Sequence, residues 1–123
     1  MARRPRTIAK KIIQLALGKK AEDVMLFDLR KITAMTDFFV ICTGTSDVQV
    51  RAIAGAVIDG CKKEKVSVYS VEGLDAATWV LIDLVDVVVH VFKPDVRKYY
   101  QLERLWGDAV IETFDDDGRE AIR

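Results

Sequence analysis

The stretch TDFFVICTGTSDVQ, residues 36–49, carries the signals that decide the fold. Its first half, up to Thr43, is rich in β-forming residues that are apolar at consecutive positions, which predicts a strand buried on both faces of a sheet. A turn follows, and Ser46 with Gln49 three positions later forms a capping box, which predicts a helix over 47–63. The apolar positions of that helix recur every three or four residues, so we expect one side of it to lie on the sheet.

Working outward from this stretch, hydrophobic periodicity predicts six further elements. They are a helix over 7–17 with Thr7 as its N-cap, strands over 24–29, 67–71, 79–83 and 86–92, and a last helix from 94 to about 106. The strand–helix–strand order implies that 67–71 pairs in parallel with the buried strand through a right-handed crossover. The chain is therefore predicted to be a single α/β (α+β) domain with a mixed sheet of about five strands flanked by helices. We expect a core over about 7–110 and a mobile acidic tail over 111–123.

The two strands over 79–92 predict a hairpin with a short link. With residues 84–85 as that link, Asp83 would oppose Asp86, and Trp79 would oppose His90. The other face of this hairpin would be apolar, with Val80, Ile82, Val87, Val89 and Val91. The link residues are poor for a tight turn, which favours Gly, Asn or Asp.

Composition excludes several classes of protein. The chain has 123 residues, half of them hydrophobic, which is enough for one domain with a core. Nineteen basic residues balance nineteen acidic ones, which argues against a uniformly basic nucleic-acid binder. The chain has two cysteines and one histidine, which argues against a zinc site or a disulfide scaffold. No apolar run approaches the ~20 residues of a membrane span, and no secretory signal is recognisable. We expect a reduced, cytoplasmic protein without membrane contact, metal or cofactor.

Charge is unevenly distributed along the chain. Residues 1–20 carry seven basic residues and no acid, whereas residues 100–123 carry seven acids and three arginines. A small RNA-binding or ribosome assembly protein that uses the basic end is therefore one alternative. No signature of sequence-specific nucleic-acid binding accompanies it, so we expect no such binding.

Catalysis is the second alternative. The Gly-containing turn over 43–46 resembles that of nucleotidyltransferases, which hold magnesium with two carboxylates one residue apart. Asp83 and Asp86 are spaced by three, so a divergent enzyme would need the fold to bring both within about 5 Å of the turn. His90 is the single histidine and lies in an apolar strand, where a structural or binding role is more common than catalysis. We therefore predict no catalytic residues.

Three blocks of sequence are similar to one family, the ribosomal silencing factors (RsfS, Iojap-related). The first covers 36–46 and 49–52, the second covers 72–73, 79–83 and 86–92, and the third covers 97–109. The chain departs from the family pattern at Val85, where the family usually has glycine. A β-branched residue is costly at positive φ, so the turn is expected to be strained or of another type.

The resemblance implies a fold related to nucleotidyltransferases but without their activity. It implies binding to the large ribosomal subunit at large-subunit ribosomal protein fourteen, which would block subunit joining and repress translation when nutrients are scarce. It also implies a possible homodimer. Aromatic and acidic residues beside one another suit a basic protein partner. The candidate interface residues are Trp79, Asp83, His90, Tyr100, Glu103 and Trp106.

Overall fold

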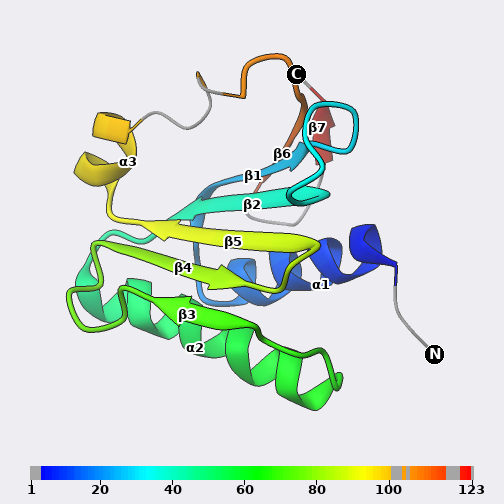
Figure 1. Cartoon of the computed structure of the whole chain (residues 1–123). Helices are drawn as coiled ribbons and strands as arrows, with labels where there is room; N and C mark the ends of the chain where they lie inside the picture. The colour runs from blue at the N-terminus through cyan, green and yellow to red at the C-terminus, as the bar shows by residue number, and fades with distance from the viewer. Residues whose placement is uncertain (1–3, 101–103, 105, 116–119, 123) are drawn as a thin grey trace.

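Two parallel strands, β2 (Phe38–Thr43) and β5 (Val87–Phe92), lie at the centre of a seven-stranded mixed sheet (Figure 1). The order of strands is β3-β4-β5-β2-β1-β6-β7, and every other neighbouring pair is antiparallel. The computed structural model describes residues 4–100, 104, 106–115 and 120–122. The remaining elements are α1 (Pro5–Gly18), β1 (Glu22–Asp28), α2 (Asp47–Lys63), β3 (Ser70–Glu72), β4 (Trp79–Asp83), α3 (Pro94–Tyr100), β6 (Val110–Phe114) and β7 (Glu120–Ile122).

Helices α1 and α2 lie together on one face of the sheet, and α3 lies apart from them (Figure 1). The face under α1 and α2 carries the larger core, because alternate residues of the central strands, such as Val40 and Val89, point towards the helices. The second face carries a smaller cluster of Phe27, Leu29, Ile41 and Phe92, onto which Val96 of α3 packs. The predicted α+β class is confirmed, and the second face is left partly open to solvent.

The predicted helix over 47–63 has the bounds of α2, and one half of its capping box is as expected: Ser46 Oγ accepts a hydrogen bond from the Gln49 backbone N–H at 3.1 Å. In the other half, Gln49 Oε1 accepts from the Thr45 N–H in place of the Ser46 N–H. The first helix begins two residues earlier than predicted. Its N-cap is Arg4, which makes no side-chain cap bond, and Pro5 is at the first turn, where its missing N–H costs nothing. The prediction of Thr7 as N-cap was therefore wrong.

The predicted parallel pairing of the strand after α2 was wrong. Strand β3 runs in the same direction as β2, but β4 and β5 lie between them, and β3 pairs with β4 alone. The parallel neighbour of β2 is β5, which comes later in the chain. Strand direction follows from the crossover, whereas adjacency depends on which later strands fill the gap.

The hairpin register differs from the prediction by two residues. Trp79 pairs with Phe92, and Asp83 pairs with Val88, so four residues, 84–87, lie between the last paired residues in place of the two expected. An even shift keeps every side chain on its predicted face, so the apolar face of the hairpin is as expected.

The link itself forms a tight turn around Val85. Its φ is 73°, and the Asp86 N–H donates to the Leu84 carbonyl at 3.0 Å, which is the bond of a γ-turn. Asp83 Oδ1 accepts from the Val85 N–H at 2.7 Å and holds the turn in place. Val85 therefore occupies the left-handed backbone region that normally favours glycine.

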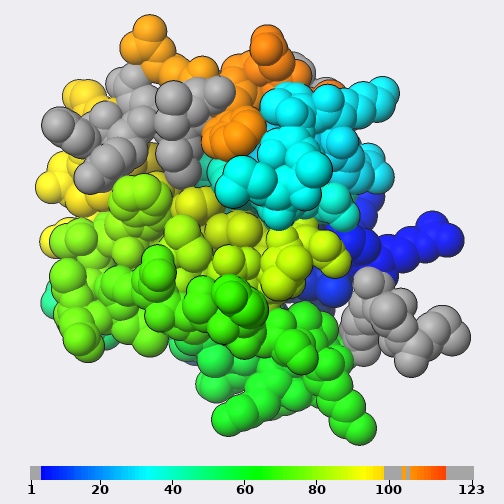
Figure 2. All heavy atoms as spheres, viewed as in Figure 1, coloured from blue at the N-terminus to red at the C-terminus, as the bar shows by residue number. Residues whose placement is uncertain are grey.

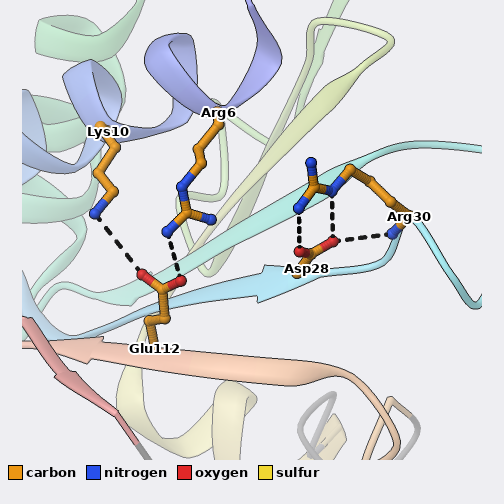
Figure 3. A network of polar contacts seen from close by, with 5 residues as sticks. All are labelled: Arg6, Lys10, Asp28, Arg30 and Glu112. Carbon is orange, nitrogen blue, oxygen red and sulfur yellow. Dashed lines mark hydrogen bonds and ion pairs between the residues drawn. The ribbon is translucent and has the colours of Figure 1, made fainter.

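The prediction of a mobile tail from residue 111 was wrong for the part that forms β6. This strand pairs with β1 along five residues, and the final β7 pairs with β6. Glu112 faces α1, where Arg6 donates to it at 2.6 Å and Lys10 lies 3.7 Å away (Figure 3). The acidic C-terminal region is thus tied to the basic N-terminal helix, and the sheet has more strands than the five expected.

Candidate partner-binding surface

A pocket of about 320 Å³ opens on the second face of the sheet. Its floor is formed by side chains of β2, β4 and β5, and its rim by the segment between β1 and β2 and by the residues before β3. The lining residues include Thr36, Phe39, Leu81, Asp83, Val88, His90 and Trp106. Figure 2 shows this face, with the yellow-green atoms of β4 and β5 lying between the cyan atoms of residues 29–37 and the green atoms around β3.

Three exposed apolar side chains stand at the rim of this pocket. Met35 is 85% exposed, Tyr69 76% and Val85 54%, and all three line the pocket. We call the pocket and these three residues the docking face. Large apolar side chains gathered in this way around a hollow are typical of an interaction site.

His90 lies at the floor of the pocket and is buried in an aromatic cluster. Its ring makes an edge contact with Phe39 at 4.7 Å and stacks on Phe92 at 5.9 Å. The Trp79 Nε1–H donates to His90 Nδ1 at 3.1 Å. Burial lowers the pKa of His90 to about 4, so the imidazole is neutral at physiological pH.

The candidate interface residues divide into three groups. Asp83, His90 and Trp106 line one pocket, and for Asp83 and His90 this agrees with the hairpin face that alternation predicted. Trp79 is half-buried and packs on Phe92 at 4.9 Å, beside the pocket rather than in its lining. Tyr100 ends α3, but its side chain lies outside the described part of the chain, as does the whole of Glu103.

Sequence reasoning missed Met35, Thr36 and Tyr69 as members of this surface. Met35 and Thr36 precede the buried strand, in a segment without periodicity. Tyr69 lies within the predicted strand over 67–71, but in the structure β3 begins only at Ser70, after it. Thr36 was quoted in the first family block, which was a usable signal. No pattern of neighbouring residues predicts that these side chains lie in the same lining as Val85, because they come from separate loops that are far apart in sequence.

The turn over 43–46 has no free cradle for a phosphate. The Gly44 N–H donates to the Phe92 carbonyl at 2.8 Å, and the Thr45 N–H donates to Gln49 Oε1 at 2.6 Å. Asp83 pairs with Val88, four residues along β5 from Phe92, which corresponds to about 13 Å of strand. The convergence required for a nucleotidyltransferase-like metal site is therefore absent between these described residues.

No group of three or more potential metal ligands occurs among residues 4–100, 104, 106–115 and 120–122. Within the same residues, none of the helices combines the length and apolar character needed to cross a bilayer. At the basic end, Arg6 and Lys10 are both engaged by Glu112, which reduces the charge available to RNA phosphates.

The sequence and the fold of this chain were compared with those of known proteins. A family model described as "Ribosomal silencing factor during starvation" matches residues 2–122. A ribosomal silencing factor RsfS from Bacillus subtilis is 46% identical over 110 residues, covering 86% of this chain and 93% of the relative. The mouse protein named "Mitochondrial assembly of ribosomal large subunit protein 1" is 30% identical over 108 residues, covering 85% of this chain and 46% of the relative.

A crystal structure of a protein from Chromobacterium violaceum superposes with a TM-score of 0.84 at 37% identity, covering 85% of this chain and 88% of that one. Fold and sequence together thus define a protein of the ribosomal silencing class. The chain belongs to the RsfS family, as its three sequence blocks predicted.

Proposed function

We propose that this chain binds the large ribosomal subunit in the cytoplasm, at large-subunit ribosomal protein fourteen, and sterically prevents the two subunits from joining. Translation would then fall under nutrient limitation without any chemistry by the chain itself. Family membership supports this proposal, and the name of the mouse relative links that protein to the large subunit. Steric repression requires a stable docking surface and no catalytic group.

The observation that carries the proposal is the docking face. Met35, Tyr69 and Val85 expose apolar surface around an apolar pocket, which is costly in water unless a partner covers it. Asp83 lies in the same lining and would favour a basic partner surface, as ribosomal proteins commonly present. Tyr100 and Glu103 follow in the third family block, and we propose that they extend this surface.

The test is co-sedimentation with isolated large and small ribosomal subunits at two salt concentrations. We expect pelleting with the large subunit only, and a strong reduction for Met35→Lys, because it adds a positive charge against a basic partner and removes apolar contact. The matched control is Val48→Lys, which makes the same kind of change at a 71% exposed residue on α2, away from the docking face. Equal binding by both variants would contradict the proposed surface, and no pelleting of the parent would contradict the proposed function.

Glu103 supplies an electrostatic test of the same proposal. We expect Glu103→Lys to weaken binding more than Glu103→Gln, because reversal adds repulsion from a basic partner whereas neutralisation only removes attraction. Equal losses would argue against the electrostatic part.

The homodimer is part of the proposal as well. Light scattering across the working concentration range measures it directly. Scattering from monomer alone would contradict it.

A further inference from the structure

The pocket of the docking face contains two buried polar atoms without a hydrogen-bond partner among the described residues: Thr36 Oγ1 and His90 Nε2. Thr36 is 7% exposed and His90 is 4% exposed, so bulk water does not satisfy these atoms, and a partner's atom reaches them only when side chains of the pocket lining move aside. Folded proteins pair nearly all such groups, and an exception in a binding pocket indicates a place for a partner's atom.

The hydrogen bond from Trp79 determines which kind of atom His90 needs. Indole Nε1–H can only donate, so His90 Nδ1 is the acceptor in this pair. A neutral imidazole carries one proton, which must then be on Nε2. This nitrogen is therefore a donor that lacks an acceptor. The lowered pKa of His90, caused by burial, agrees with the neutral form.

The charges around the pocket restrict the acceptor further. Asp83 lines the same pocket, and a second carboxylate entering there would meet its like charge. Lysine or arginine would bring only donors and leave His90 Nε2–H unpaired. An uncharged oxygen, on an amide or a backbone carbonyl, fits both conditions, and its apolar body would contact Phe39 and Val88.

The size of the surface indicates a protein as the occupant. A small molecule that fills about 320 Å³ would leave the three protruding rim side chains exposed, whereas a protein surface would cover the pocket and the rim together. We propose that the pocket receives one uncharged group of the protein partner, whose oxygen accepts hydrogen bonds from His90 Nε2–H and from the Thr36 hydroxyl. This inference rests on the proposed function and specifies the chemistry of the partner at its docking face.

The test measures binding to isolated large ribosomal subunits for His90→Phe, Thr36→Val and Thr36→Ser. His90→Phe keeps a ring but removes the donor, and we expect roughly tenfold weaker binding, the loss for one hydrogen bond left unmade in an apolar site. Thr36→Val keeps the side-chain shape without the hydroxyl, and we expect it to weaken binding less than His90→Phe does. Thr36→Ser keeps the hydroxyl, and we expect it to bind like the parent. Thermal unfolding of each variant verifies folding, and if His90→Phe does not fold, the two Thr36 variants decide the result.

The Met35→Lys variant separates the two proposals. If Met35→Lys weakens binding while the folded His90 and Thr36 variants bind like the parent, the hydrogen bond in the pocket is refuted and the docking face stands. If Met35→Lys also binds like the parent, the docking face is wrong and the pocket inference fails with it. A small molecule retained by the purified chain in native mass spectrometry, and displaced by His90→Phe, would likewise refute a protein occupant.

Discussion

The ion pair between Arg6 and Glu112 joins the two ends of the chain, and its removal should measurably destabilise the fold. Arg6 Nη2 lies 2.6 Å from Glu112 Oε1, and the two residues are 106 positions apart in sequence (Figure 3). The Glu112 side chain is 9% exposed and that of Arg6 is 39% exposed. The change to test is Glu112→Gln, which keeps the size of the side chain and removes its charge.

The expected loss lies between two known limits. Exposed pairs contribute about 0–1 kcal/mol, and breaking a fully buried pair costs about 3–5 kcal/mol. Solvent reaches the guanidinium but hardly the carboxylate, so we expect Glu112→Gln to lower the free energy of unfolding by about 1–2 kcal/mol. For a chain of 123 residues, with an unfolding entropy of about 2.1 cal/mol/K per residue, this corresponds to a Tm lower by about 4–8 °C.

The assay is thermal and urea unfolding of the parent, Glu112→Gln, Arg6→Ala and the double variant. The double-mutant cycle isolates the coupling between the two residues, and high salt should reduce it. Arg30→Ala is the control, because Arg30 pairs with Asp28 at 2.7 Å on the exposed surface and should shift the Tm less. A Tm for Glu112→Gln within 1 °C of the parent (about 0.3 kcal/mol by the same entropy) would refute the idea that this pair holds β6 against α1.

Three further predictions concern the backbone and pH. Val85→Gly should raise the Tm, because it relieves about 1–2 kcal/mol of left-handed strain at φ 73° and loses only about 0.5–1 kcal/mol to added chain entropy; a lower Tm would contradict the strain. Gly73→Ala should lower the free energy of unfolding by about 2 kcal/mol or more, because φ is 88° and the added Cβ would lie 2.1 Å from the Trp79 carbonyl oxygen. The control is Gly55→Ala on α2, which should raise the free energy of unfolding because nothing lies within 4 Å of the added Cβ. Urea unfolding of both variants measures the difference, and similar effects of the two changes would argue against the clash. Burial lowers the pKa of His90 from 6.5 to about 4 in the folded chain, so between these pH values the unfolded chain binds a proton that the folded chain does not. The contribution to stability is therefore full above about pH 6.5 and falls as the pH drops towards 4. Unfolding midpoints measured across this range that fall as much for His90→Gln as for the parent would refute this assignment.

Local signals predicted the elements whose determinants lie close together in sequence. The capped helix α2, the buried strand β2 and the strand β4 follow from residues within a few positions of each other. The family also followed from sequence, because its three blocks are contiguous stretches. The faces of the hairpin were predicted correctly although its register was not, because alternation determines the face and the turn determines the register.

The candidate site was only partly predictable for the same reason. Asp83 and His90 were assigned to one face from alternation, and they share the pocket. Met35 and Tyr69 come from loops, and no periodicity shows where a loop returns to the sheet.

The amino-acid sequence by itself thus determined the α+β class, the central helix and strands, and the family, because propensity, capping and alternation act over a few residues. Only the tertiary structure decided that β5 pairs with β2, that Val110–Phe114 joins β1, and that Glu112 meets Arg6 across the length of the chain. It also decided that two buried polar groups share one pocket. Those outcomes depend on contacts between residues far apart in sequence, and the free energies of such contacts cannot be inferred from the pattern of neighbouring residues.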